Sequence, residues 1–112
     1  MIMAKLIYIS GKIGEETVSK ATMDKFNAAQ ERLREQGWNT INPIEPIFQE
    51  DARKAREDQN DKIDLYTWFL LWDMYTIAYC DAIYMLKDWK DSGGATAEYN
   101  FAKAIGKELI FE

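Results

Sequence analysis

The sequence predicts an α/β fold in which a four-stranded parallel sheet lies between two layers of helices. Short apolar runs rich in β-branched and aromatic residues alternate with longer amphipathic segments, in the order βαβαβαβ. Such alternation favours parallel strands joined by right-handed helical crossovers. The chain has 112 residues, which suits a single hydrophobic core, so we expect one domain over residues 1–112.

The first part of the chain contains two predicted strands and one predicted helix. Residues 4–10 are apolar enough for a strand that is buried on both faces. An amphipathic helix follows from about Ser19 and ends at Gly37, which suits a helix C-cap. The apolar stripe of this helix consists of Met23, Phe26, Ala29, Gln30 and Leu33. The second strand, over residues 38–42, is stopped by Pro43.

Residues 43–61 differ from their surroundings because charges of alternating sign leave no clear apolar stripe. We interpret this segment as a solvated helical turn or a mobile loop. A long connection after a strand can act as a lid over a ligand, and a plain surface excursion is the alternative. We therefore expect a charged loop or lid at about residues 43–61.

The second half of the chain supplies the remaining elements. Residues 62–79 form a helix that is apolar over most of its circumference, as expected for a helix between a sheet and another subunit. Strands are predicted over residues 82–86 and 108–111, with a helix over residues 93–105 between them. Ligands bind such sheets at the carboxyl ends of the strands. Those ends carry Gly11 to Gly14, which includes Lys12, then Asn42 with Pro43, and residues 88–94.

Composition excludes several classes of function. The net charge of −5 disfavours a polymeric nucleic acid or an anionic membrane as partner. The apolar runs are too short for a signal sequence or a membrane span, so we expect a soluble, cytoplasmic protein. Aromatic residues make up 13% of the chain and include four Trp, which indicates a homo-oligomer in which a partner subunit covers some rings.

The chain contains no histidine, which excludes Ser-His-Asp and Cys-His catalysis and histidine zinc sites. The single cysteine, Cys80, follows an apolar stretch and is interpreted as a buried small side chain rather than a catalytic thiol. Carboxylates, Tyr or Lys must therefore carry any covalent or proton chemistry. We expect no metal and no organic cofactor, and the absence of a G-x-G-x-x-G motif argues against a dinucleotide.

The segment from Asp91 to Glu98 is the strongest candidate for a ligand site. It reads Asp-Ser-Gly-Gly-Ala-Thr-Ala-Glu and lies just after a predicted strand. In a helix Glu98 lies over the small residues Gly94 and Ala95 and faces open space. The helix start offers free N–H groups to an anion. The alternative is that Ser92 is only an N-cap and that Glu98 is a solvated surface residue.

With these pieces in place, the chain resembles the nucleoside 2-deoxyribosyltransferase-like superfamily, and within it the small proteins of the DUF4406 type. The resemblance implies a Rossmann-like (flavodoxin-like) three-layer sandwich with a sheet order of about 2-1-3-4. It rests on five segments, namely Tyr-Ile-Ser-Gly at residues 8–11, Gly-Trp-Asn-Thr-Ile-Asn-Pro at 37–43, Cys-Asp-Ala-Ile-Tyr-Met-Leu at 80–86, Trp-Lys-Asp-Ser-Gly-Gly-Ala-Thr-Ala-Glu at 89–98, and Ala-x-x-x-Gly-Lys at 102–107.

The resemblance implies roles for three residues. Glu98 matches the superfamily's nucleophile, which attacks the anomeric carbon and releases the base. Asp73 lies eight residues before Asp81, the spacing of the family's second acid, and would protonate the leaving base. Tyr8 matches a tyrosine that orients the nucleophile. The alternatives are that Asp73 is an exposed gap in an apolar helix and that Tyr8 only packs at the end of the sheet.

Position 92 separates two branches of the superfamily. Transferases of free nucleosides tend to carry Asp there, whereas the 2′-deoxynucleoside 5′-monophosphate N-hydrolases carry Ser and bind a phosphate. Ser92 with Gly93 and Gly94 therefore predicts a phosphate or sugar site. Lys12 could add positive charge or could be a solvated lysine. Trp89 could stack on a base or lie at an interface.

These observations favour hydrolysis or transfer at the N-glycosidic bond of a (deoxy)nucleoside 5′-monophosphate or nucleoside, with Glu98 as nucleophile. A small-molecule nucleoside or nucleotide is then the expected ligand. The alternative function is a non-catalytic nucleotide-binding or sensing module of the same fold.

Overall fold

The computed structural model describes residues 4–14, 18–59 and 62–112 and contains a four-stranded parallel sheet with the order β2-β1-β3-β4. The strands are β1 (Leu6–Ser10), β2 (Asn39–Ile41), β3 (Ala82–Met85) and β4 (Glu108–Phe111). The helices are α1 (Lys20–Glu35), α2 (Pro46–Gln59), α3 (Leu65–Tyr79) and α4 (Gly93–Ala104), with a short 3-10 helix η1 (Trp89–Asp91) before α4. The predicted α/β class and strand order are confirmed.

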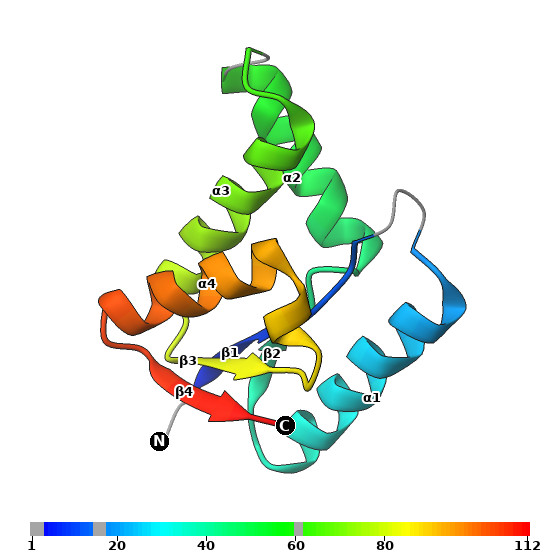
Figure 1. The fold of residues 1–112 in the computed structure, drawn as a ribbon, viewed down its shortest axis with the longest axis vertical. Helices are drawn as coiled ribbons and strands as arrows, with labels where there is room; N and C mark the ends of the chain where they lie inside the picture. The colour runs from blue at the N-terminus through cyan, green and yellow to red at the C-terminus, as the bar shows by residue number, and fades with distance from the viewer. Residues whose placement is uncertain (1–3, 15–17, 60–61) are drawn as a thin grey trace.

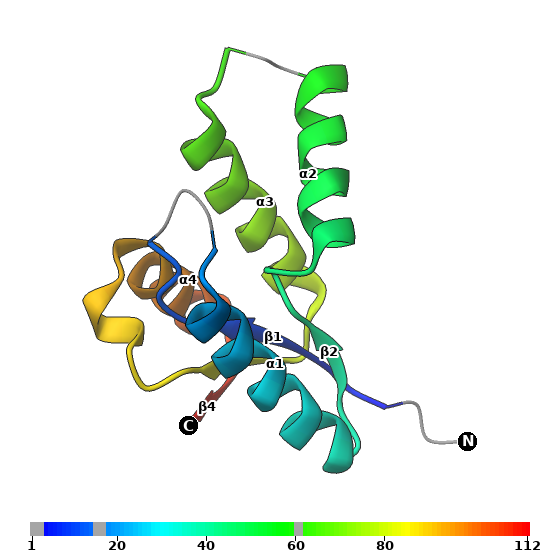
Figure 2. The same cartoon turned by 90° about the vertical axis from the view of Figure 1, so that its right-hand side faces the viewer.

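β1 lies inside the sheet, and its side chains alternate between the two helical layers. Ile9 packs with Phe26 of α1 in one core cluster, whereas Tyr8 packs with Ile83 of β3 in the other, which also contains buried residues of α3 and α4. Figures 1 and 2 show α1 on one side of the sheet and α3 and α4 on the other. β1 is therefore buried on both faces, and Tyr8 and Ser10 share the face that α3 and α4 cover.

Polar side chains and a glycine set the helix boundaries. The Ser19 hydroxyl accepts a hydrogen bond from the Thr22 N–H (3.2 Å) at the start of α1, and the Ser92 hydroxyl accepts one from the Ala95 N–H (3.1 Å) at the start of α4. Gly37 has a φ of +95°, the left-handed conformation that commonly follows a helix. The predicted N-cap at Ser92 and helix end at Gly37 are confirmed.

One predicted core position of α1 is wrong. Met23 is 41% exposed, whereas the preceding residue, Thr22, is buried. Thr22 lies four residues before Phe26 and so continues the helical stripe, which places Met23 about 100° away around the helix. The other predicted members of the stripe are buried, namely Phe26, Ala29, Gln30 and Leu33.

The charged segment after β2 is a regular helix, α2, where the sequence predicted a solvated helical turn or a charged, mobile loop. Its buried face is narrow because the residue at its centre, Ala52, is small and completely buried. The Trp68 indole N–H of α3 donates to the Ala52 carbonyl (2.6 Å), and the Arg56 Nε donates to the Ile63 carbonyl (2.8 Å). Packing against α3 therefore stabilises a helix whose own sequence shows no strong apolar stripe.

α2 and α3 form an antiparallel hairpin that extends away from the sheet (Figure 2). α3 begins at Leu65, after the N-cap Asp64, rather than at residue 62. Only the C-terminal half of α3 reaches the core, where Ile77 and Cys80 are buried. The Cys80 thiol donates to the Thr76 carbonyl, and burial raises the pKa of this thiol to about 11, which agrees with a structural role.

Among the residues that the structure describes, no helix is both long and apolar enough to cross a membrane.

Candidate active site

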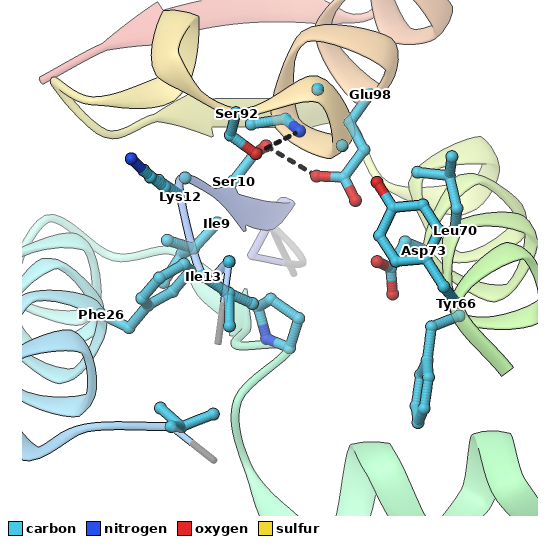
Figure 3. Close-up of a pocket in the computed structure, with 18 of the residues that line it drawn as sticks. Ile9, Ser10, Lys12, Ile13, Phe26, Tyr66, Leu70, Asp73, Ser92 and Glu98 are labelled. Carbon is cyan, nitrogen blue, oxygen red and sulfur yellow. Dashed lines mark hydrogen bonds between the residues drawn. The ribbon is translucent and has the colours of Figure 1, made fainter. Parts of the chain in front are cut away.

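A pocket of about 700 Å³ opens at the carboxyl end of β1 (Figure 3). One wall consists of the end of β1 and the loop that follows it. A second wall is the start of α4, and the third is the α2–α3 hairpin. The volume lies within the range of small-molecule sites in proteins, and the place is where parallel α/β sheets bind ligands.

Glu98 lies at the junction of these walls. It is only 6% exposed, and it reaches the pocket across Ala95 and Gly94, the small residues one turn before it on α4. Its two carboxylate oxygens accept different hydrogen bonds. The Ser10 hydroxyl donates to Oε1 (2.7 Å) and the Tyr8 hydroxyl donates to Oε2 (3.2 Å). The carboxylate is therefore fixed in one orientation, and it is buried rather than open to solvent as its helix position suggested.

Tyr8 and Ser10 reach the same carboxylate because they are two residues apart on β1 and so point to the same face of the sheet. Sequence reasoning identified Tyr8 and missed Ser10. This period of two could have identified Ser10, because the residue two positions after Tyr8 points to the same face of the sheet. Burial raises the pKa of the Tyr8 hydroxyl well above its usual value, which keeps it neutral as a donor.

Asp73, on α3, is the second carboxyl group of the pocket. Burial and the nearby charge of Glu98 raise the pKa of Asp73 well above its usual value. Burial also raises the pKa of Glu98, but hydrogen bonds from Asp73, Ser10 and Tyr8 oppose that rise by stabilising its charged form. The two carboxyl groups therefore titrate as a coupled pair, in which the charge of Glu98 raises the pKa of Asp73 and the interaction with Asp73 lowers the pKa of Glu98.

The start of α4 and the loop after β1 form the other end of the pocket. Ser92, Gly93 and Gly94 line it from α4, and Gly11 and Lys12 line it from the β1 loop. In Figure 3, Lys12 and Ser92 lie on one side of Glu98 and Asp73 lies on the other. The pocket thus has an end with a helix N-terminus and a lysine, and an end with a carboxyl group whose pKa is raised.

Three contacts hold the start of the loop after β1 in place. A Cβ atom on Gly11 would come within 2.6 Å of Leu86, so the close approach of this loop to the end of β3 requires glycine. Asp88 accepts a hydrogen bond from the Lys12 backbone N–H (3.0 Å) and pairs with the Lys25 ammonium, which also donates to the Lys12 carbonyl (2.6 Å). The position of the loop is therefore set from both β3 and α1.

A family model described as a domain of unknown function, DUF4406, matches residues 5–111. The chain belongs to the DUF4406 family. No curated protein matches it. Among solved structures, this DUF4406 chain is similar to a 2-desoxiribosyltransferase from Leishmania mexicana, with 18% sequence identity and a TM-score of 0.61. The similarity covers 96% of this chain and 63% of that protein, so the chain spans less than two thirds of the transferase's length. The predicted nucleoside 2-deoxyribosyltransferase-like fold is confirmed.

The DUF4406 chain brings eight of the ten predicted site residues to one pocket, which are Tyr8, Gly11, Lys12, Asp73, Ser92, Gly93, Gly94 and Glu98. Asn42 and Trp89 do not line it. The Asn42 side chain is buried and donates to Asn27 (3.1 Å) while accepting from the Ile44 N–H (3.3 Å). The Trp89 ring packs against the Tyr99 ring at a tilt of 42°, with ring centroids 4.5 Å apart. Both have structural partners, and their roles in binding remain predictions.

Apart from Asp73, the side chains of the hairpin wall are the part of the site that sequence reasoning missed. Phe48, Gln49 and Arg53 line the pocket from α2, and Tyr66 and Phe69 are among the residues that line it from α3. The only signal for this wall is the i, i+4 spacing of residue pairs such as Gln49 and Arg53, which is visible once residues 46–59 are read as a helix.

Within residues 4–14, 18–59 and 62–112, no cluster of three or more His, Cys, Asp or Glu side chains is arranged to hold a metal ion. The described side chains place two carboxyl groups in one pocket. One is the Glu98 carboxylate, held by two hydroxyl groups, and the other is Asp73, whose pKa is raised by burial and by the charge of Glu98. Such a pair can combine nucleophilic attack with protonation of a leaving group.

Proposed function

We propose that this protein cleaves or transfers the N-glycosidic bond of a (deoxy)nucleoside 5′-monophosphate or nucleoside, with Glu98 as nucleophile. The observation that carries the proposal is the buried Glu98 carboxylate, which is oriented by two hydroxyl groups and lies beside Asp73, whose pKa is raised. The solved 2-desoxiribosyltransferase of the same fold supports the choice of a nucleoside as substrate. No cofactor is needed for this reaction.

The proposed reaction has two steps. A Glu98 oxygen forms a bond to the anomeric carbon while the bond from that carbon to the base nitrogen breaks. The electron pair of the broken bond stays on the base, and the Asp73 carboxyl group supplies the proton that neutralises it. The glycosyl ester on Glu98 is then attacked by water or by a second base, and Asp73, which lost its proton in the first step, accepts the proton that the water or the N–H of the second base gives up.

The α4 end of the pocket favours a 5′-monophosphate over a free nucleoside. The N–H groups at a helix start and the Ser92 hydroxyl can donate hydrogen bonds to phosphate oxygens, and Lys12 adds a positive charge on the same side of Glu98. A carboxylate at position 92 would repel a phosphate. We therefore expect Ser92→Asp to shift the preference of the enzyme from monophosphates toward nucleosides, measured as the ratio of kcat/KM for the two forms.

The direct test is incubation with a panel of deoxynucleosides and their monophosphates, with chromatography to detect free base. The proposal predicts base release by the wild-type protein and its loss in Glu98→Gln. The matched control is Glu31→Gln, which changes an exposed glutamate on α1, the helix on the opposite face of the sheet. Base release that survives in Glu98→Gln would show that another group is the nucleophile.

One observation favours the second candidate, a non-catalytic nucleotide-binding or sensing module. Both oxygens of Glu98 already accept hydrogen bonds and the side chain is almost completely buried, which limits its freedom to attack a substrate. In that case monophosphates bind the protein but no base is released from any member of the panel. Calorimetric binding measured beside the release assay separates the two functions.

We also propose that the protein works as a cytoplasmic homo-oligomer. Large side chains on α3 are exposed, including Leu71 (46%), Tyr75 (59%) and Tyr79 (57%). Trp72, Tyr75 and Tyr79 form a continuous row of ring contacts along that helix. A second copy of the chain that covers this row would remove apolar surface from water. Light scattering on wild type and on Leu71→Lys tests this, because the charge should shift an oligomer toward monomer.

A further inference from the structure

Arg53 is a charged side chain in the pocket that the proposed reaction does not yet use. It lies on α2, and its guanidinium carbon is 5.3 Å from the centre of the Phe69 ring on α3. Phe69 is one helical turn before Asp73 and lines the same pocket. Arg53 therefore belongs to the Asp73 end of the pocket, where the leaving base must lie, and not to the α4 end.

The backbone that carries Arg53 is held firmly. Its neighbour Ala52 is completely buried between the helices, and the Ala52 carbonyl accepts the hydrogen bond from the Trp68 indole. The Arg53 side chain is exposed, and within residues 4–14, 18–59 and 62–112 it forms no salt bridge. The guanidinium stacked against Phe69 thus keeps hydrogen-bond donors for a ligand.

We propose that Arg53 selects the leaving base and favours bases that present a carbonyl oxygen, namely 6-oxopurines and 2,4-dioxopyrimidines, over bases with an amino group at that edge. This inference rests on the proposed function. A guanidinium has five donors and no acceptor, so it pairs with a carbonyl oxygen. If the base carries an exocyclic amino group there, the N–H donors of the guanidinium face the N–H donors of the base, and the missing hydrogen bond weakens binding.

The same contact stabilises the departing base during bond cleavage. When the bond to the anomeric carbon breaks, its electron pair enters the ring of the base. In an oxo-base that negative charge spreads to the carbonyl oxygen, where the positive guanidinium of Arg53 can stabilise it. Asp73 then delivers the proton to the ring. Arg53 and Asp73 thus act on the same leaving group, whereas Lys12 lies on the other side of Glu98, with Ser92, where the phosphate is proposed to bind (Figure 3).

The test uses calorimetric binding, so it does not depend on turnover. Every protein carries Glu98→Gln to prevent reaction, and the ligands are the monophosphates of deoxyinosine, deoxyadenosine, deoxyuridine and deoxycytidine. We expect the oxo-base of each size class to bind roughly tenfold more tightly than its amino counterpart, the effect of one well-placed hydrogen bond. Arg53→Gln should reduce this preference to about twofold or less, and Arg53→Lys should retain part of it because the charge remains.

Lys54→Gln is the matched control. Lys54 is the next residue on α2, carries the same charge, is exposed, pairs with Glu50 and does not line the pocket. It should leave the preference unchanged. Circular dichroism establishes that Arg53→Gln retains its helices before binding is measured, and Arg53→Lys provides a second variant that preserves the aliphatic stem.

Three results would overturn the inference. The first is equal binding of oxo-bases and amino-bases by the protein with Arg53. The second is a preference that survives Arg53→Gln. The third is a loss of affinity for all four monophosphates by the same factor in Arg53→Gln, which would assign Arg53 to the phosphate. Base release by the protein with Glu98 intact is measured separately. Base release without an oxo-base preference in binding supports the proposed function and rejects the role of Arg53. An oxo-base preference without base release supports the role of Arg53 in binding and rejects the proposed catalytic function.

Discussion

The two halves of the pocket are built in different ways. The half formed by β1 and α4 contains Tyr8 and Ser10 of the strand and Glu98 of the helix, all of them buried, and hydrogen bonds fix these side chains. The half formed by the α2–α3 hairpin projects from the sheet and is held by packing between two helices, with Arg53 and Phe69 at the surface of the pocket. In the proposed reaction the sheet half therefore supplies the nucleophile and its hydrogen-bond donors, and the hairpin half supplies Asp73 and the choice of base.

Asp73 connects the two halves, and its loss should have the largest effect on rate among the variants below. Asp73→Asn keeps the shape of the side chain but removes the proton for the leaving base, so kcat should fall roughly 10²- to 10³-fold. The falling limb of the pH–rate profile on the alkaline side should disappear, because it reports deprotonation of this acid. Steady-state base release between pH 5 and 9 measures both. A variant with the full wild-type profile would remove Asp73 from the mechanism.

The same substitution should alter how stability depends on pH. The folded protein raises the pKa of Asp73 and Glu98, so above about pH 4 it retains protons that the unfolded chain releases. This contribution to stability is present at low pH and is lost as the pH rises through the raised pKa values. Urea unfolding at pH 5 and pH 8 should therefore show a smaller loss of stability in Asp73→Asn than in wild type. An equal loss in the two proteins would mean that Asp73 is ionised in the folded state.

A smaller effect is expected for the two hydroxyl groups of the sheet half. Ser10→Ala and Tyr8→Phe each remove one hydrogen bond to Glu98. Each should lower kcat about tenfold, with little change in KM. Each should also raise the apparent pKa of the acidic limb of the pH–rate profile, because the charged form of Glu98 loses a hydrogen-bond donor. A rise in KM with kcat unchanged would place these residues in binding rather than in the chemistry.

The smallest effect on the reaction is expected for a change that loosens the hairpin half. Trp68→Phe removes the indole donor to the Ala52 carbonyl and should cost about 1 kcal/mol in the free energy of unfolding. Because α2 then holds Arg53 less firmly, KM should rise severalfold while kcat stays within twofold. Chemical denaturation and steady-state kinetics measure the two effects. A large fall in kcat with normal KM would show that the hairpin also positions the chemistry.

The sheet half was largely predictable because its signals are local. The period of two along β1, the small residues before Glu98 and the N-cap at Ser92 each follow from neighbouring residues. The roles of Glu98 and Asp73 required the family resemblance in addition, since spacing alone does not bring α3 and α4 together. Ser10 could have been predicted in the same way, because it lies two residues after Tyr8 on the same face of β1.

The hairpin half was not predictable in the same way because its stability comes from tertiary contacts. α2 has a small buried residue, Ala52, where an independent amphipathic helix would have a large one, and its charges are typical of a solvated segment. The contact that holds α2 joins Ala52 to Trp68, two residues that no local pattern relates. In the sequence, therefore, nothing distinguishes Arg53 from the other charged residues of α2; the position of α2 against α3 places it in the pocket.

The most direct measurement of the central claim is peptide mapping by mass spectrometry after a rapid acid quench of the protein with a 2′-deoxynucleoside 5′-monophosphate. The account predicts a deoxyribosyl phosphate adduct on the peptide that contains Glu98, formed together with free base and absent in Glu98→Gln. Continued release of base by Glu98→Gln, or an adduct on a different residue, would contradict it.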